Sequence, residues 1–287
     1  MRPTAPEDVP TLADIWIDAA FGESGAPPGL PEPIYLAHEI ATGSAFVAEV
    51  DRQAVGFGAV LTRGEVSNLA ELFVRRRAQS GGVGAALLEA LLARAAPSRF
   101  TIASSDPRAV ALYARHGMVP RWPYYYLTVE ADRLRLPGAD VAVAEASWDD
   151  PAWTAWDRDC AGRPRPEDHR YLREACAGVP LWFRRGTETV GYGCVQLPRS
   201  DQAAEAATIG PLGARDPDVA VACTMAAVRW AARHRRVLKL ALPGAHAALA
   251  SLLEAGFRIV DADTFMSTSP PAFVDPLCYI PIGAEFF

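Results

Sequence analysis

A glycine-rich stretch between an apolar segment and an amphipathic one has the residue types of an anion site. The apolar segment ends at Val74, and Gln79-Ser80-Gly81-Gly82-Val83-Gly84-Ala85 follows after the arginines 75 to 77. Apolar residues then recur with helical spacing, so a helix is predicted to begin near Val83. A helix N-terminus presents N–H groups and positive potential, and Gly82 and Gly84 place no Cβ in front of them. With the added charge of the arginines, the stretch predicts a pyrophosphate site.

A second stretch joins the first in a pattern that resembles the GNAT superfamily of acyl-CoA-dependent N-acyltransferases. Residues 79–84, QSGGVG, match the family signature Q/R-x-x-G-x-G/A, although Arg76 replaces the family's proline. Residues 106–118, DPRAVALYARHGM, are similar to the family helix N/D-x-x-A-x-x-L-Y-x-x-x-G-F, with methionine in the last place. The resemblance covers roughly residues 1–130. It implies a GNAT fold and an acyl-CoA co-substrate, most commonly acetyl-CoA, with no metal.

The resemblance also implies which residues bind the co-substrate. The backbone of the strand before the loop would pair with the pantetheine arm, and the loop would hold the pyrophosphate. The backbone N–H near Val74 would stabilise the oxyanion. The binding residues implied in this way are Leu72, Phe73, Val74, Gln79, Ser80, Gly81, Gly82, Val83, Gly84, Ala85, Asp106, Ala109 and Tyr113.

Acyl transfer from a thioester to an amine also needs a proton donor and a proton acceptor. Tyr113 occupies the position of the family's tyrosine, and its usual pKa of about 10 keeps it protonated beside a thiol of pKa about 8.5. We therefore expect Tyr113 to be the general acid. The base stays open between Glu71, the C-terminal carboxylate of Phe287 and a water molecule. Strand alternation does not decide where Glu71 points, because the family has a bulge there.

The elements that position these residues occur twice along the chain. In the first half we predict helices near 8–20, 33–41, 83–94 and 107–117, and strands at 44–50, 54–62, 68–74, 100–104 and 124–130. A similar order recurs after residue 137, and the helix-ending Gly117 and Gly256 stand 139 residues apart. Such a repeat predicts two tandem copies of an α+β GNAT fold, with a mixed, mostly antiparallel sheet flanked by helices. The domains would be a catalytic domain, 1–136, and a GNAT-like domain, 137–287.

The second copy is predicted to be degenerate. At the place of the phosphate loop it has Asp216 and Asp218, which would cap a helix but repel a phosphate, and Leu252 stands in place of the tyrosine. We expect this copy to pack on the first as a second GNAT subunit would, and to help wall the acceptor pocket. Residues considered for that wall, or for plain packing, are Trp148, Trp153, Trp156 and Trp182; the loop 22–33, Trp122 and the tyrosines 124–126 would border the pocket.

Composition narrows the function and its setting. The chain has 287 residues and a net charge of −6, which disfavours a nucleic-acid partner and suits a cationic small-molecule amine as acceptor. No apolar run is long enough to span a membrane, and five widely spaced cysteines suit a reducing cytoplasm. We therefore expect a cytoplasmic N-acetyltransferase, either a monomer that forms an intramolecular pseudo-dimer or a homodimer. The alternative is a non-catalytic acyl-CoA-binding or sensing protein, which would not need Tyr113.

Overall fold

The computed structural model describes residues 1–26, 33–138, 140–198, 206–270, 273–283 and 286–287. The helices are α1 Val9–Phe21, α2 Tyr35–Thr42, α3 Val83–Leu92, α4 Pro107–Arg115, α5 Pro151–Ala161, α6 Pro166–Glu174, α7 Pro217–Ala231 and α8 Leu249–Glu254. The strands are β1 Arg2–Pro3, β2 Ser44–Val50, β3 Gln53–Arg63, β4 Val66–Val74, β5 Ser98–Ala103, β6 Val119–Glu130, β7 Ala142–Glu145, β8 Gly178–Arg185, β9 Glu188–Gln196, β10 Ala206–Ala214, β11 Val237–Pro243, β12 Arg258–Ser267 and β13 Tyr279–Ile280. The elements predicted in the first half and the recurrence of a similar order after residue 137 are confirmed, whereas α5, α6, β1, β7 and β13 are additions to them.

Local chemistry explains why several of these elements begin and end where they do. Asp51 and Arg52, with φ of 49° and 63°, form the two-residue turn between β2 and β3, as tight hairpins require. Asp106 caps α4, because its Oδ1 accepts from the main-chain N–H of Arg108 at 2.9 Å. Pro107, at the first position of that helix, also favours a helix start there.

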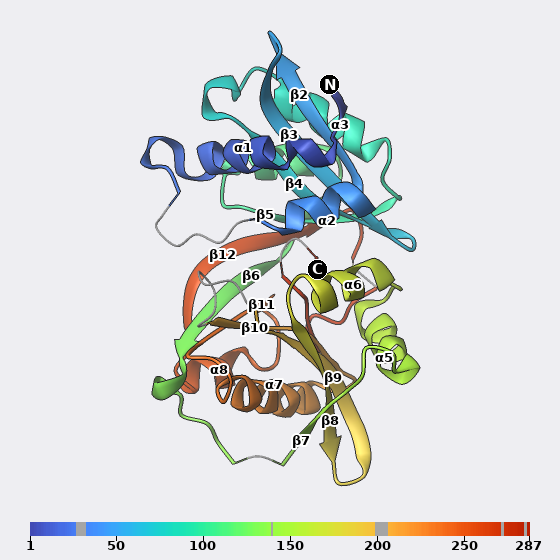
Figure 1. The fold of residues 1–287 in the computed structure, drawn as a ribbon, viewed down its shortest axis with the longest axis vertical. Coiled ribbons are helices and arrows are strands. Elements are labelled where there is room, and N and C mark those ends of the chain that lie inside the picture. Colours follow the sequence, from blue (N-terminus) through green and yellow to red (C-terminus); the bar gives the residue numbers. More distant parts are fainter. Residues whose placement is uncertain (27–32, 139, 199–205, 271–272, 284–285) are drawn as a thin grey trace.

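All the described strands join in one mixed sheet. Its 13 strands have the order β1-β2-β3-β4-β5-β12-β6-β11-β10-β9-β8-β7, and β13 pairs with β10 (Figure 1). The pairs are antiparallel except for β4 with β5 and β10 with β11. The sheet is therefore mixed and mostly antiparallel, as the sequence predicts.

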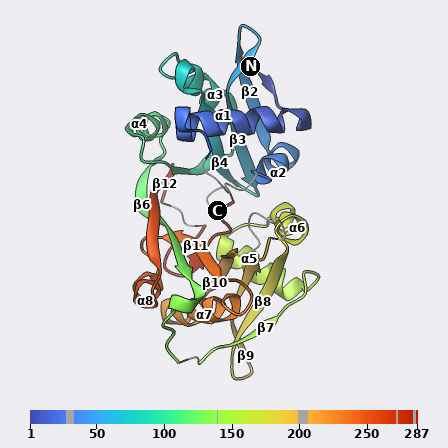
Figure 2. The ribbon, with the colours of Figure 1, turned by 60° about the vertical axis from the view of Figure 1, so that its left-hand side comes forward.

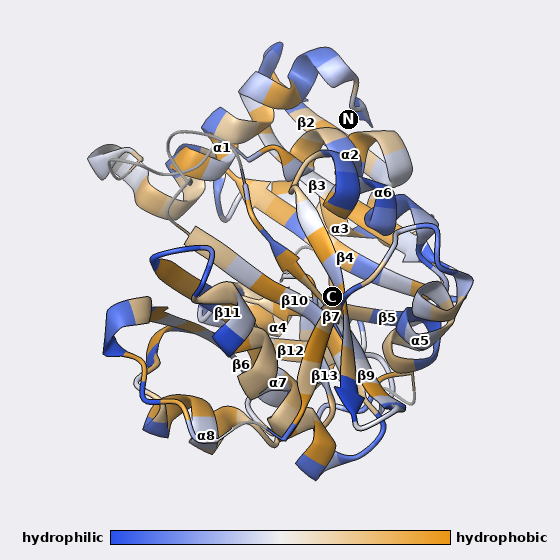
Figure 3. Cartoon of the chain, turned by 60° about the horizontal axis from the view of Figure 1, so that its bottom comes forward, coloured by the Kyte–Doolittle hydropathy of each residue, from blue (hydrophilic) through white to orange (hydrophobic). Residues whose placement is uncertain are grey.

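Helices cover both faces of this sheet in each half. In the first half α1 and α2 bury Leu12, Ile15 and Leu36 on one face, and α3 buries Leu87 and Leu91 on the other. In the second half α7 and α8 cover one face and α5 and α6 the opposite one (Figure 1). Apolar residues accordingly concentrate on the strands and on the inner sides of the helices (Figure 3).

All five cysteines are free thiols.

The final long strand of each half lies beside strands of the other half. β12 pairs with β5 through Phe265 and Ile102, and β6 pairs with β11 through Leu127 and Leu240. β6 and β12 also pair with each other between the two halves (Figure 2). Residues 124–130, which the sequence predicts as a strand of the first half, are confirmed as a strand, and both of its neighbours in the sheet belong to the second half. Exchange of these strands makes the sheet continuous and leaves no open edge at the boundary.

A buried ion pair also joins the two halves. Arg63 on β3 donates from Nη2 to Asp168 Oδ1 on α6 at 2.7 Å, and each side chain is 5% exposed. His38 on α2 contacts the same oxygen at 3.0 Å through Nε2. Burial by itself raises the pKa of Asp168, but the hydrogen bonds with His38 and Arg63 and the charge of Arg63 outweigh it and lower the pKa to about 2.

We predict that Asp168→Asn lowers the free energy of unfolding by about 3–5 kcal/mol, because it leaves the buried Arg63 charge with only the half-exposed carboxylate of Glu167, 3.9 Å from its Nε, as a counter-charge. The matched control is Asp149→Asn, whose ion pair with Arg173 is largely exposed, so its effect should stay below about 1 kcal/mol. Urea unfolding of both variants measures the difference.

The stability difference between wild type and Asp168→Asn depends on pH in one direction. The pKa of Asp168 is depressed in the folded protein, so its stabilisation is present above the unfolded value of about 3.9. It is lost as the pH falls from there towards the folded value of about 2. The gap between wild type and Asp168→Asn should therefore narrow below about pH 4. Equal stabilities of the two proteins at neutral pH would contradict the assignment.

Candidate active site

A cleft of about 820 Å³ opens in the first half where two neighbouring strands separate. β4 and β5 pair only from Val66 to Asn68, opposite residues 98–100. Beyond that point both strands line the cleft, and Thr101 Oγ1 donates to Leu69 O at 2.8 Å where they diverge. An edge of β4 inside the sheet therefore faces a cleft, and an extended ligand could add to it as a strand does.

Eight of the predicted site residues line this cleft. They are Glu71, Leu72, Phe73, Val74, Gln79, Asp106, Ala109 and Tyr113. The other six, Ser80 to Ala85, form the turn and the first residues of α3. Residues at the cleft that carried no functional prediction include Trp16, Tyr35, Thr101, Ser104, Ser105 and Asp263.

The turn before α3 has the geometry of an anion site. Gly82 is the N-cap of the helix with φ of 83°, and the first helical bond runs from Ala86 N to its carbonyl at 3.0 Å. The N–H groups of residues 83–85 therefore have no acceptor within the helix. A Cβ on Gly82 would meet no atom within 4 Å, so the space before those donors is open. Gln79 Nε2 donates to Val74 O at 3.0 Å and ties the turn to the end of β4.

The three arginines before the turn are held by the protein's own acceptors. Arg75 donates to Ala54 O at 3.1 Å, and Arg77 donates to Gln53 Oε1 at 2.8 Å. Arg76 donates to main-chain carbonyls of α1. Their charges stay beside the turn, and their hydrogen bonds fix its position against β3 and α1.

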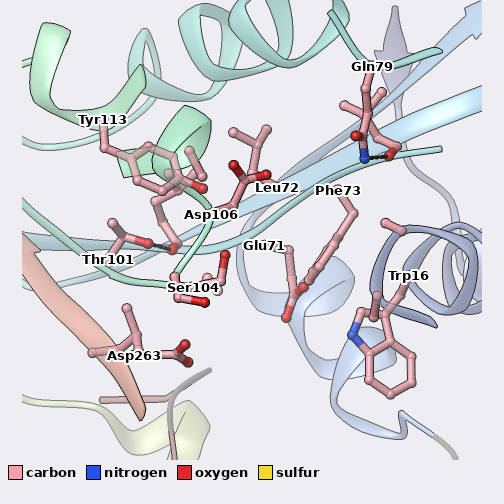
Figure 4. Close-up of a pocket in the computed structure, with 18 of the residues that line it drawn as sticks. Trp16, Glu71, Leu72, Phe73, Gln79, Thr101, Ser104, Asp106, Tyr113 and Asp263 are labelled. Carbon is pink, nitrogen blue, oxygen red and sulfur yellow. Dashed lines mark hydrogen bonds between the residues drawn. The ribbon is translucent and has the colours of Figure 1, made fainter. Parts of the chain in front are cut away.

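Tyr113 reaches the cleft from α4, on the far side from Gln79 (Figure 4). Burial raises the pKa of its hydroxyl well above the usual value, and the carboxylates of Glu71 and Asp106 raise it further. The hydroxyl therefore stays protonated at physiological pH and can donate a hydrogen bond.

A β-bulge decides the direction of Glu71. In the pairing of β3 with β4, Leu69 lies opposite Val60 and Glu71 opposite Ala59, so Ala70 is the extra residue. The bulge interrupts the alternation of side chains, and Glu71 projects into the cleft although it is only 4% exposed (Figure 4).

Comparisons with known proteins agree with this geometry. A family model described as an acetyltransferase (GNAT) domain matches residues 32–121. The chain contains a GNAT domain. A search of curated proteins found no match.

Solved structures share the fold along nearly the whole chain. A protein from Pyrococcus horikoshii, described as a candidate acetyltransferase, has a TM-score of 0.73 at 20% identity, over 99% of this chain and 94% of that one. A tandem GNAT protein from the clavulanic acid biosynthesis pathway has a TM-score of 0.62 at 16% identity, over 93% and 98%. A GCN5-related N-acetyltransferase from Sphaerobacter thermophilus has a TM-score of 0.64 at 16% identity, over 93% and 94%.

The second half closes the place that corresponds to the cleft of the GNAT domain. β10 pairs in parallel with β11 from Ala206 to Ile209, much as β4 pairs with β5. Farther along, β13 pairs with β10, and the N–H of Ala214 donates to Cys278 O at 3.2 Å. The C-terminal segment thus occupies the strand edge that is open in the GNAT domain.

The helix that follows β10 also has its N-terminus occupied. Asp216 Oδ1 accepts from the N–H groups of Asp218 at 2.9 Å and Val219 at 3.2 Å. A carboxylate of the chain therefore sits at the donors that a phosphate would need.

The C-terminal residue does not approach the cleft of the GNAT domain as a base. Phe287 is buried among Phe100, Tyr124 and Phe265, and its main-chain oxygen accepts from Arg163. Among the described residues that line the cleft, Phe287 is absent, whereas Glu71 is present. The Phe287 alternative for the base is therefore not supported by its position.

The aromatic residues that line the cleft are not the tryptophans considered for the wall of the acceptor pocket. Trp148, Trp153, Trp156 and Trp182 pack together in the second half, and none is among the described residues of the cleft. Tyr124 is core, and Tyr126 lines the cleft. Of the loop 22–33, Pro33 reaches the cleft, and residues 27–32 lie outside the described part of the chain.

Asp263 is a cleft residue that sequence reasoning missed. It lies on β12, next to β5, and accepts a hydrogen bond from Tyr126 Oη at 2.8 Å. Burial raises the pKa of this carboxyl, and the Tyr126 hydrogen bond opposes that effect. No local motif marks Asp263, since strand exchange alone brings it to the GNAT domain.

Within the described residues, no helix is long and apolar enough to cross a lipid bilayer.

We predict that Gly82→Ala weakens acetyl-CoA binding about tenfold or more. The added Cβ would stand before the N–H groups at the start of α3 and cost the pyrophosphate a charge-assisted hydrogen bond. The matched control is Gly186→Ala in the β8–β9 turn, which also has a positive φ and open space around it. Both changes should lower stability similarly, since both strain the backbone. Isothermal titration with acetyl-CoA separates them, and equal affinities in the two variants would contradict a pyrophosphate site at the turn.

Proposed function

We propose that the chain transfers an acyl group, acetyl in the first instance, from acyl-CoA to an amine of a small molecule. The amine would attack directly, within a ternary complex. The observation that carries this proposal is that three features lie next to one another: the open edge of β4, the N–H donors at the N-terminus of α3, and a cleft lined by both Glu71 and Tyr113. A thioester bound along that edge would lie within reach of both proton-transfer groups.

Each group of the cleft has a role in this reaction. The turn at 79–85 binds the pyrophosphate, and main-chain groups of residues 72–74 bind the pantetheine arm. Glu71 accepts a proton from the ammonium form of the acceptor, directly or through a water molecule. The amine nitrogen then forms a bond to the thioester carbon, and the N–H near Val74 stabilises the oxyanion. The attached nitrogen, now cationic, releases its second proton to water. When the oxyanion collapses and the C–S bond breaks, Tyr113 donates its proton to the departing sulfur, and the resulting phenolate regains a proton from water.

We propose different roles for the two halves, because the edge of β4 is open and the corresponding edge of β10 is filled. We assign the chemistry to residues 1–136 and a structural and pocket-building role to residues 137–287. The second half supports this assignment with its filled edge at β10 and its occupied helix N-terminus at Asp216. The exchanged strands make one chain resemble a pair of GNAT subunits, so we propose that the monomer is an intramolecular pseudo-dimer.

A non-catalytic acyl-CoA-binding or sensing protein would use the same turn and strand edge. The positions of Tyr113 and Glu71 favour the enzyme, because a protein that only binds acyl-CoA needs neither group in its cleft.

We predict that Tyr113→Phe lowers kcat about 10²-fold or more, as loss of a general acid does, and leaves the Kd of acetyl-CoA unchanged. Tyr125→Phe is the control, because Tyr125 packs against the core of the second half. Thiol release with a library of amines measures turnover, and titration measures binding. Undiminished turnover of Tyr113→Phe would remove the proposed role.

We predict a single acetyl-CoA site per chain. Titration calorimetry of the intact protein should give a stoichiometry near one, because β13 fills the second strand edge. Two equivalent sites would contradict the role given to residues 137–287. Binding without thiol release, across a broad set of amines, would favour the sensing protein over the enzyme.

A further inference from the structure

The cleft is acidic and aromatic. Its described lining residues include the carboxylates Glu71, Asp106 and Asp263, and no lysine, arginine or histidine is among them. Aromatic side chains surround these carboxylates, namely Trp16, Tyr35, Phe73, Tyr113 and Tyr126. Carboxylates combined with aromatic faces favour organic cations, because both present negative potential to an ammonium group.

Asp263 lies at the end of the cleft that is farther from the pyrophosphate turn. Figure 4 shows Gln79 at one end of the drawn residues and Asp263 at the other, with Glu71 between them. If the co-substrate's pyrophosphate is held at the turn, the acceptor approaches from the Asp263 end. A group bound there would therefore belong to the acceptor.

The three carboxylates have different surroundings. Asp106 is already engaged, since it caps α4 and forms an ion pair with Arg108 at 2.8 Å. Among the described residues, Asp263 has one hydrogen-bond partner, the Tyr126 hydroxyl, which leaves most of its acceptor capacity to the cleft. The hydroxyl orients the carboxylate, and its half-buried setting excludes part of the solvent that would screen a bound charge.

We propose that Asp263, oriented by Tyr126, binds a cationic group of the acceptor at a distance from the reacting nitrogen. The acceptor class is then a diamine or polyamine: one nitrogen reacts beside Glu71 and a second, protonated nitrogen pairs with Asp263. This inference rests on the proposed acyl transfer and adds a specificity-determining residue to it. The second half thereby contributes a side chain to the site of the first through its exchanged strand.

The burial of Asp263 is consistent with this role. Desolvation raises the pKa of its carboxyl, and the charge of Asp261 raises it further. A cation paired with Asp263 would offset both effects. Asp261 itself is exposed, and its Oδ1 accepts from the N–H of Ala262 at 2.8 Å. It provides a control of equal charge on the same strand, outside the cleft.

The test compares Asp263→Asn with Asp261→Asn in the full-length protein. Thiol release is measured with acetyl-CoA and three probes: 1,4-diaminobutane, spermidine and the monoamine n-butylamine. We expect Asp263→Asn to raise KM for the diamine and for spermidine about tenfold to hundredfold, as loss of a charged hydrogen bond does. KM for n-butylamine, kcat and the Kd of acetyl-CoA should change little, and Asp263→Glu should restore part of the affinity. Asp261→Asn should behave as wild type.

The outcomes separate this inference from the proposed function. An unchanged KM for both polycations in Asp263→Asn, or equal efficiency of wild type with diamine and monoamine, would overturn the role of Asp263 while acyl transfer stands. Wild type that binds acetyl-CoA but releases no thiol with any amine would overturn acyl transfer, and this inference with it. A structural role alone would shift the KM of all three probes together, which would also contradict the proposal.

Discussion

The parting of β4 from β5 is the constraint on which the rest of the structure depends. A strand edge inside a sheet carries main-chain groups that need partners, because buried N–H and C=O groups without hydrogen bonds are costly. The chain meets this need in two ways. In the first half the edge faces a cleft, and in the second half β13 pairs with the corresponding edge. The same fold therefore produces an open cleft in one half and a closed sheet in the other.

A second consequence of this arrangement concerns the helix that follows each parted strand. Its N-terminal N–H groups lie at the end of the strand edge, where a negative group stabilises them. Gly82 leaves those groups open in the first half, and Asp216 satisfies them with its own carboxylate in the second. Both helices pack on the sheet through an apolar face, but α7 has a side-chain cap at its N-terminus whereas α3 has none.

The exchange of β6 and β12 brings side chains of both halves to one cleft. β12 carries Asp263 to the end of β5, and β6 carries Tyr126 to the same place, where the two side chains form a hydrogen bond. The buried contact between Arg63 and Asp168 adds a second point of attachment. The shared sheet thus places side chains of the second half beside the cleft of the first, as the role in specificity that we propose for Asp263 requires.

The sequence by itself determined what depends on neighbours a few residues apart. The cap at Asp106, the turn at Gly82 and the position of Tyr113 on α4 are local, since capping and helical periodicity act within one or two turns. The repeat of elements likewise followed from patterns along the chain. Glu71 marks the limit of this reasoning: its presence on the strand was readable, but its direction depends on a bulge in the pairing with β3.

Tertiary structure alone decided which distant segments meet. Tyr126 and Asp263 are 137 residues apart, and their hydrogen bond exists because β6 and β12 pair across the boundary between the halves. The same holds for β13 on β10, for the burial of Phe287 beside Arg163, and for the four tryptophans that pack away from the cleft. Strand pairing carries no sequence mark of its own partner, because main-chain hydrogen bonds are the same for every residue type except proline.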